Sequence, residues 1–175
     1  MLKIVTYPDP ILTMPNQSIE FPLSNDVKIL ITEMWECVRG LGIGLAAPQI
    51  GANVKMCIIH MAKEDKSSKS PKTSHINKDQ DFVMINPEIV FYSQTEVLMT
   101  EGCLSFPEDY YDIWRPQGIR VRYQDEKGKF KEKAISGLLA RVIQHEVDHL
   151  NGKLFINLGG RKLKHENVDK SKVID

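Results

Sequence analysis

LLARVIQHEVDHL, at Leu138–Leu150, is the segment around which we expect this chain to be organised. Its apolar residues recur at helical spacing, and it ends in the pattern His-Glu-x-x-His, His145 to His149. Residues four apart lie on one face of a helix, about one turn from each other, so both imidazoles can reach the same cation. Glu146 lies beside them and can handle a proton of a metal-activated water. The segment therefore predicts a helix that carries two ligands of a metal site.

An alternative is that the two histidines belong to a solvated stripe on an exposed helix. Leu138 and Val142 continue the same stripe as His145 and His149, which places the histidines at the end of an apolar ridge. Two buried imidazoles without a partner would be costly, and a metal ion removes that cost. The context therefore favours the metal site. Gln144 and Asp148 are expected to surround the site or to face solvent.

The third ligand must come from elsewhere, and Cys103 is the candidate. It lies in Glu101–Pro107 (EGCLSFP), a glycine-bearing turn after a predicted strand. A lone cysteine is more often a small buried hydrophobe than a ligand, and Cys37, on an apolar helix, and Cys57, on a strand, fit that description. Because the three cysteines are odd in number and dispersed, they argue against a disulfide framework and favour a reducing compartment.

Length and composition predict one domain spanning residues 1–175. The chain has 42% hydrophobic residues, enough to build a core. Its 23 basic and 23 acidic side chains cancel, which argues against a general attraction to DNA or to an anionic membrane. No apolar run approaches the roughly 20 residues needed to span a bilayer, and the N-terminus breaks into proline-rich turns. We therefore expect a cytoplasmic protein.

The first half of the chain contains a predicted helix and a long polar segment. A helix is expected after a cap at Ser24 or Asn25, ending near Gly40. Its buried face would consist of apolar residues at three-four spacing, namely Val27, Leu30, Ile31, Met34, Trp35 and Val38. Residues 63–81 are almost wholly polar, and such a segment cannot bury enough surface to order itself. We interpret 63–81 as a surface loop inserted within the domain.

Most of the remaining elements are predicted strands. Residues 53–60 and two extended pieces within 82–92, around Asn86-Pro87, come first. Residues 119–123 alternate cleanly and form a hairpin with 130–135, after which Ser136 would cap the ligand helix. This order predicts an α+β fold with largely antiparallel sheets packed around a central metal-ligand helix.

The chain resembles peptide deformylase. All three signature segments of that family are present in order, at Gly42–Gln49 (GIGLAAPQ), Glu101–Ser105 (EGCLS) and Gln144–His149 (QHEVDH). The resemblance runs from about Lys3 to about Leu158. Three ordered motifs are far more specific than any one of them. The family's reaction is the removal of the N-formyl group from the N-terminal formyl-methionine of new polypeptides, which releases formate.

The resemblance also implies a role for individual residues. The metal ligands would be Cys103, His145 and His149, and Glu146 would be the general acid and base. Gln49 and the backbone N–H of Leu104 would stabilise the oxyanion. The remaining implied residues are Gly44 for backbone contacts to substrate, Ile43, Met99, Leu138 and Val142 for the methionine pocket, and Glu101 paired with Arg115 as structural support.

Two departures from the family's pattern lie near the expected pocket. Tyr110-Tyr111 stands where some members carry an arginine near the substrate. Arg141 stands where some members have an aliphatic pocket residue, and we expect it to trim the pocket or re-edge it, that is, change the shape of its edge. The family's partners are N-formyl-methionyl nascent peptides and the ribosome, for which only a small basic cluster, Arg161 to Lys164, is available.

The identity of the divalent ion stays open at this point. A Cys-His-His set with tetrahedral geometry indicates zinc on chemical grounds. The resemblance instead implies Fe(II) in the cell, with Zn(II), Ni(II) or Co(II) able to occupy the same ligands. A thiolate next to Fe(II) also predicts sensitivity to oxygen and peroxide at Cys103.

Two other functions remain as alternatives. A zinc peptidase would need a third His or Glu ligand downstream of His149, and His165 and Glu166 are available without a recognisable spacing. A purely structural metal site would be closed by four ligands, and no second cysteine has a ligand-like setting. Replacing Glu146 with glutamine separates a structural site from a hydrolase. A structural site should tolerate the change, whereas a hydrolase should lose most of its turnover and keep its metal.

Overall fold

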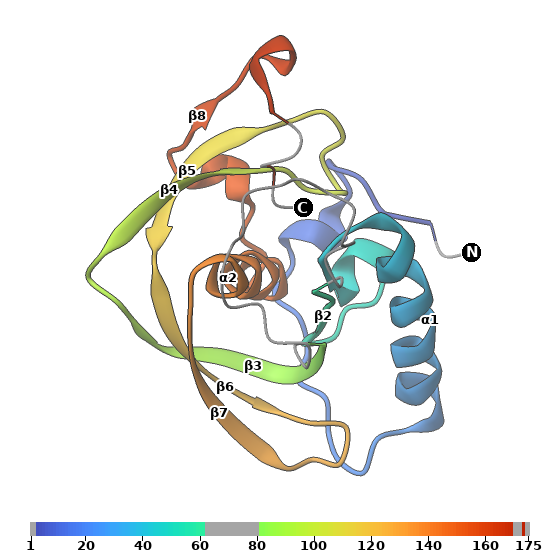
Figure 1. The fold of residues 1–175 in the computed structure, drawn as a ribbon. Helices are drawn as coiled ribbons and strands as arrows, with labels where there is room; N and C mark the ends of the chain where they lie inside the picture. Colours follow the sequence, from blue (N-terminus) through green and yellow to red (C-terminus); the bar gives the residue numbers. More distant parts are fainter. Residues whose placement is uncertain (1–2, 62–80, 170–172, 174–175) are drawn as a thin grey trace, which may run out of the picture.

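The central helix of the fold is α2 (Leu138–Leu150), which Figure 1 shows almost end-on with strands on three sides of it. The structure is a computed structural model and describes residues 3–61, 81–169 and 173. The loop expected at 63–81 lies, except for Asp81, outside the described residues. Within the described ranges the second α-helix is α1 (Asn25–Leu41). No described helix is long and apolar enough to cross a membrane.

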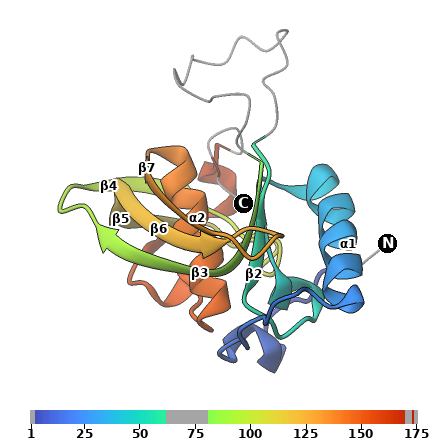
Figure 2. The same cartoon turned by 90° about the horizontal axis from the view of Figure 1, so that it is seen from below.

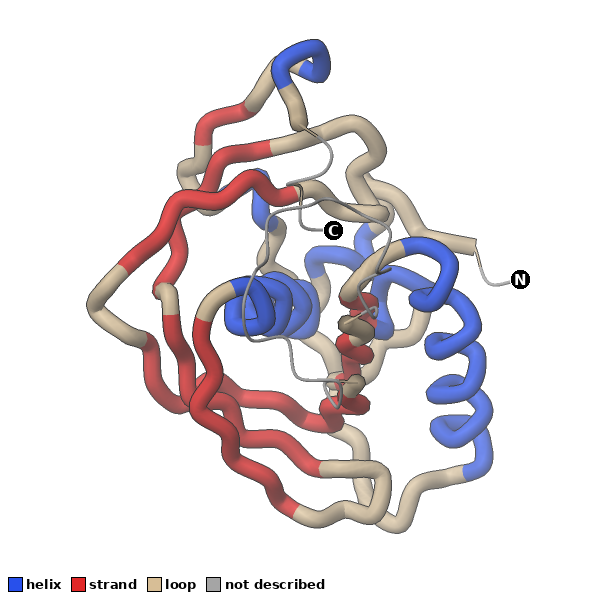
Figure 3. Tube along the Cα trace, in the orientation of Figure 1, coloured by secondary structure: helices blue, strands red, loops and turns tan. Residues whose placement is uncertain are grey.

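In the part of the chain that the structure describes, eight strands form two antiparallel sheets around α2 (Figures 1 and 3). The five-stranded sheet has the order β1-β2-β3-β6-β7, and the three-stranded sheet has the order β4-β5-β8. Their bounds are β1 Gly44–Ala46, β2 Met56–Ile59, β3 Phe82–Tyr92, β4 Glu96–Glu101, β5 Tyr111–Pro116, β6 Gly118–Gln124, β7 Phe130–Ser136 and β8 Arg161–Lys162. The predicted α+β class is confirmed, with the ligand helix at its centre.

Strands β1 and β2 separate the two helices, as Figure 2 shows from below. Alternate residues of a strand point to opposite faces, and both strands are buried on both faces. On one face Ala46 and Cys57 pack into the core around α2. On the other, Leu45 and Met56 pack into the core beneath α1. These short strands therefore hold the first motif of the sequence against α2.

Helix α1 begins as predicted and ends later than predicted. The Ser24 hydroxyl accepts a hydrogen bond from the Val27 N–H at 3.3 Å, which satisfies one of the free donors of the first turn. The helix does not end at Gly40: it continues through Leu41, and Gly42 is its C-terminal cap. The cap N–H donates to the Val38 carbonyl at 3.1 Å, which closes the last turn.

The entry to α2 differs from the sequence prediction. Ser136 does not cap the helix, because it is the last residue of β7 and pairs with Gly118 of β6. Gly137 is the N-cap instead, with a φ of 71° and no side-chain cap. A positive φ favours glycine, and here it lets the chain turn directly from strand to helix. The β6–β7 hairpin itself is confirmed, with the register Arg122↔Glu132 near its middle.

The two extended pieces expected around Asn86-Pro87 are parts of one strand, β3. The irregularity lies where it was expected, because the β3–β6 register shifts between Ile85 and Glu88. Asn86 has a φ of 50°, and its side-chain amide is bonded in both directions to the backbone of Ile19, each at 2.8 Å. The chain therefore bends at Asn86 without leaving the sheet.

Candidate metal centre

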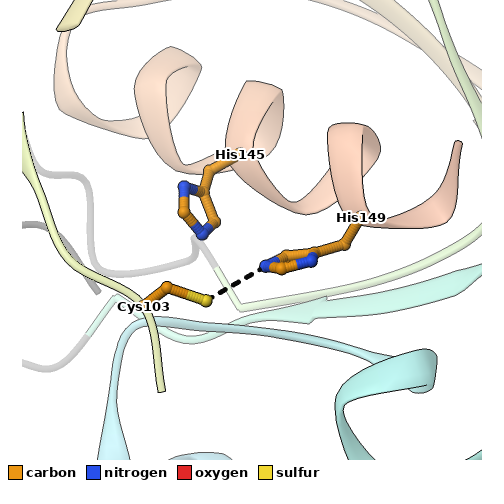
Figure 4. A group of neighbouring side chains, drawn as sticks. All are labelled: Cys103, His145 and His149. Carbon is orange, nitrogen blue, oxygen red and sulfur yellow. Dashed lines mark hydrogen bonds between the residues drawn. The ribbon is translucent and has the colours of Figure 1, made fainter. Parts of the chain in front are cut away.

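The three candidate ligands converge from two elements. Cys103 lies in the turn after β4, and His145 and His149 project from one face of α2 (Figure 4). All three are buried, and one ligand atom of each lies within 4.8 Å of the others. The Cys103 Sγ and His149 Nε2 atoms are 3.2 Å apart. Residues 46 apart in sequence thus meet at one point, in a donor set of one sulfur and two nitrogens.

His145 is oriented by the fully buried carboxylate of Glu101. Its Nδ1 lies 2.9 Å from Glu101 Oε2, and an ionised carboxylate can only accept, so Nδ1–H donates. With Nδ1 on Glu101, the other ring nitrogen of His145 is turned toward Cys103, as Figure 4 shows. Carboxylates that hold a histidine this way fix its tautomer and its ring direction for metal binding.

Two arginines neutralise Glu101. Arg115 donates from Nε to Oε1 at 2.7 Å and from Nη2 to Oε2 at 2.9 Å, and Arg141 Nη1 donates to Oε1 at 2.9 Å. Burial alone would raise the pKa of Glu101, but the bonds from His145 and Arg115 outweigh burial and hold that pKa well below its usual range. Arg115 also binds Asp148 at 2.5 Å. The expected pair of Glu101 and Arg115 is therefore part of a network of two carboxylates and two guanidinium groups.

The donor set fits a divalent cation. Thiolate and imidazole are ligands of zinc, iron and other transition metals, and three protein ligands leave a position open for water. Beside these ligands, the buried Glu146 Oε2 has no hydrogen-bond partner among the described residues. A cation at the three ligands would compensate the buried charge that the site concentrates.

Glu146 is buried beside the ligands and packs against β1. Burial raises the pKa of its carboxyl to about 7, with the charge of His145 opposing the shift. A Cβ atom built on Gly44 would lie 2.2 Å from Glu146 Oε1, so only glycine leaves room for the carboxylate there. The carboxyl can therefore change its protonation near neutral pH, from a fixed position.

Gln49 faces the same point from the 3₁₀ turn after β1 (Ala47–Ile50). Its Oε1 accepts from the Ala46 N–H at 2.8 Å, which leaves the Nε2 hydrogens to point elsewhere. Nε2 donates to Cys103 Sγ at 3.5 Å. The structure thus places an amide donor at the candidate centre, and Leu104, the next residue after Cys103, brings its backbone to the same turn.

The residues expected to line the methionine pocket lie together beside α2. Val142 is buried in the core around α2, and Ile43, Met99 and Leu138 are partly buried side chains packed against that core. All four therefore belong to the same apolar cluster around α2. Arg141, which we expected to re-edge the pocket, is 2% exposed, and its guanidinium group is turned toward Glu101 and the backbone of β4 and β5.

Several other residues lie away from this centre. His165 and Glu166 belong to a short 3₁₀ helix (His165–Asn167) and join no metal-like cluster within the described ranges. His60 lies 3.1 Å from the carboxylate of Asp81. Cys37 and Cys57 are buried free thiols, as predicted. In the small basic cluster, Arg161 binds Asp112 and Lys162 binds Asp109.

Two cavities lie beside the three-stranded sheet, with volumes of about 440 and about 320 Å³. Arg161 and Asp112 line both of them, and Trp114 lines the smaller one. None of the candidate ligands, Gln49 or Glu146 is among their lining residues. These two cavities are therefore separate from the candidate metal centre.

The sequence analysis missed what Arg141 and Gly44 do. A cation on the apolar face of a helix was a visible signal that Arg141 needs a buried acceptor. No sequence signal shows that the Cα of Gly44 touches a residue 102 positions away.

Comparison with known proteins gives one consistent answer. The family model described as polypeptide deformylase matches residues 1–164. The peptide deformylase of Mesorhizobium japonicum is 38% identical over 170 residues, which cover 95% of this chain and 88% of that protein. The crystal structure of peptide deformylase from Thermotoga maritima matches with a TM-score of 0.77 at 33% identity, covering 90% of this chain and 97% of that one. A class I type b peptide deformylase from Acinetobacter baumannii, solved with Met-Ala-Ser bound, has a TM-score of 0.79 at 30% identity, covering 90% and 98%.

Proposed function

This chain belongs to the polypeptide deformylase family, and from this premise we propose that its three buried ligands and Glu146 form the active site. The protein is a metal-dependent hydrolase that removes the N-formyl group from newly synthesised polypeptides. The observation that carries the proposal is the convergence of Cys103, His145 and His149 beside a buried carboxylate. We propose that residues 1–175 act as one catalytic unit.

Cys103, His145 and His149 would hold one divalent ion. When bound, the ion acts as a Lewis acid that lowers the pKa of water toward neutrality and polarises the formyl oxygen. We propose Fe(II) as the ion in the cell, and the same ligands suit Zn(II), Ni(II) or Co(II). Metal analysis of protein purified without oxygen tests this choice, since iron would be the main metal found if it is right.

Glu146 would move the proton of the reaction. As a carboxylate it takes a proton from the attacking water, and as a carboxylic acid it returns that proton to the departing amine nitrogen. Burial raises the pKa of this carboxyl to about 7 in the metal-free protein, and a bound cation beside it would oppose that shift. The close contact with Gly44 holds the carboxyl group in one place throughout.

Gln49 and Leu104 would stabilise the negative charge that grows on the formyl oxygen. The Gln49 amide is already oriented by its bond from Ala46, so its Nε2 hydrogens need little rearrangement. The backbone N–H of Leu104 would be the second donor. Removing one such donor typically costs about 3 kcal/mol of transition-state stabilisation.

The substrate would lie with its methionine side chain among Ile43, Met99, Leu138 and Val142. Their shared apolar cluster supports this assignment. Gly44 would offer backbone contacts to the peptide. The relative from Acinetobacter baumannii was solved with Met-Ala-Ser, a tripeptide with methionine at its N-terminus, as its ligand. We propose the cytoplasm as the site of action, nascent chains on ribosomes as the source of substrate, and no role for DNA or a membrane.

Formate release from formyl-Met-Ala-Ser tests the proposed function. The protein would be prepared anaerobically with Fe(II), and its metal content would be measured on the same sample. Turnover that depends on the bound metal supports the proposal. No formate from a folded, metal-loaded sample would contradict it, and cleavage of unformylated peptides instead would indicate a peptidase.

A further inference from the structure

Arg141 is a buried cation on the face of α2 that otherwise carries the apolar and ligating side chains. Arg115 already binds both carboxylate oxygens of Glu101, so the bond to Glu101 alone does not explain why Arg141 is placed here. A buried guanidinium group is costly unless its donors are satisfied, so the position of Arg141 must be explained by what it binds. Its remaining bonds go to the backbone of two strands of the three-stranded sheet.

The acceptors of Arg141 surround Met99. Arg141 Nη1 donates to the carbonyl of Ile113 at 2.9 Å, and Ile113 is the partner of Met99 in the β4–β5 register. Arg141 Nη2 donates to the carbonyl of Val97, two residues before Met99. The bond to Glu101 lies two residues after Met99. One guanidinium group therefore binds β4 on both sides of Met99. It also binds the neighbouring strand β5 at Ile113, opposite Met99.

The other walls of the expected pocket lie on the helix that carries Arg141. Leu138 lies three residues before Arg141 on α2, and Val142 lies one residue after it. Val142 belongs to the core around α2, and Leu138 packs against that core. Met99 packs against the same core from β4. The spacing between β4 and α2 at this level sets the width of any pocket between them. Arg141 connects α2 to β4 at two points, the carbonyl of Val97 and the carboxylate of Glu101.

We propose that Arg141 is a positioning residue that fixes the width of the methionine pocket, by tying its β4 wall to α2. The inference rests on the proposed function, because the pocket is part of that proposal. Through Glu101, the same group connects the pocket wall to the carboxylate that orients His145. The fit of the substrate side chain in the pocket and the orientation of His145 would then both depend on the group formed by Arg141, Glu101 and β4. Lysine could not replace it, since a single ammonium group cannot span the three acceptors in this geometry.

The test compares two arginines that share Glu101 and differ in what else they bind. Arg141→Met keeps an unbranched apolar side chain of similar reach and removes all three bonds. Arg115→Met is the matched control, because Arg115 binds Glu101 and Asp148 and no carbonyl of β4. Arg122→Met, on an exposed ion pair with Glu132, is the control for losing a surface arginine. Each holoenzyme is assayed on formyl-Met-Ala-Ser, formyl-Ala-Ala-Ser and formyl-Phe-Ala-Ser.

The measured quantity is the ratio of kcat/KM values between substrates. We expect Arg141→Met to lower the preference for methionine over alanine and phenylalanine by about tenfold, mainly through KM, because loss of fit at one side chain has effects of this size. Arg115→Met should lower kcat and metal retention and keep the preference. An unchanged preference in Arg141→Met, or an equal loss in both variants, would overturn the proposal.

A second variant covers the case in which Arg141→Met does not fold. Arg141→Lys keeps the charge and can satisfy one acceptor at a time, so it should show a smaller loss of preference with the fold intact. A wild-type preference in Arg141→Lys would overturn the proposal. Failure of the proposed function itself is distinguishable, since wild-type protein would then release no formate from any of the three substrates.

Discussion

The carboxylate of Glu146 lies directly against the Cα of Gly44, so closely that a Cβ there would come within 2.2 Å of Oε1. The two residues belong to different motifs, one on β1 and one on α2. Glycine is required at position 44 by this contact and not by an unusual backbone angle. The contact restricts where the buried carboxyl group of Glu146 can lie in the core.

Gly44→Ala should therefore displace the proton-transferring group. The backbone of β1 cannot yield easily, because it pairs with β2, so the Glu146 side chain must move. We expect kcat to fall by about a hundredfold, within the range of general acid-base contributions, with the metal still bound. Gly118→Ala is the control, since a Cβ there meets its nearest atom at an ordinary 3.5 Å. Full activity of Gly44→Ala would show that the position of Glu146 is not critical.

Glu101→Gln tests the support of the metal ligand. A neutral amide cannot balance Arg115 and Arg141, and it accepts from His145 with only one oxygen. Loss of such an outer carboxylate typically lowers metal affinity by about ten- to a hundredfold, and unpairing a buried charge costs about 3–5 kcal/mol. Chelator competition and urea unfolding measure the two effects.

The control for Glu101→Gln is Glu132→Gln, which breaks an exposed pair with Arg122. Exposed pairs contribute about 0–1 kcal/mol, so stability and metal binding should barely change. If both variants lose metal to the same extent, the buried network has no special role in holding His145.

The stability of the metal-free protein should fall as the pH rises from about 4.5 to about 7 on account of Glu146. The folded pKa is raised to about 7, above the ordinary value of 4.5, so in this window the folded state holds a proton that the unfolded state has released. This loss of folding free energy is absent below about pH 4.5 and complete above about pH 7. The difference between the two pKa values corresponds to about 3 kcal/mol of folding free energy.

Glu146→Gln isolates this effect, because glutamine does not titrate. The difference in unfolding free energy between Glu146→Gln and wild type should grow by about 3 kcal/mol between about pH 4 and about pH 8. Urea unfolding in the presence of a chelator measures it. A constant difference across that range would mean that Glu146 titrates normally in the folded protein.

Much of the fold and of the site could be predicted from local sequence patterns. The spacing of Leu138, Val142, His145 and His149 predicts both the helix and the face that carries the ligands, because burial and ligation use the same periodicity. The β6–β7 hairpin follows from alternation and a turn. The setting of Cys103 in a glycine-bearing turn marked it as a candidate third ligand, but nothing local links it to a helix 35 positions away, and the pocket residues came from the resemblance alone.

The features that could not be predicted depend on long-range packing. Arg141 shows in the sequence as a misplaced charge, but its acceptors include two backbone carbonyls that no pattern identifies. Ser136 looked like a cap because serine often is one, yet strand pairing with Gly118 competes for the same residue and prevails. In both cases a tertiary contact overrides a correct local preference.

Turnover and metal content of Glu146→Gln, measured on one sample, test the central claim most directly. Glutamine keeps the size of the side chain and removes its ability to accept and return a proton. The account predicts one equivalent of metal bound and formate release from formyl-Met-Ala-Ser reduced by about a thousandfold, within the range of general acid-base catalysis. Near-normal turnover with metal bound would contradict the role of Glu146 and with it the proposed mechanism.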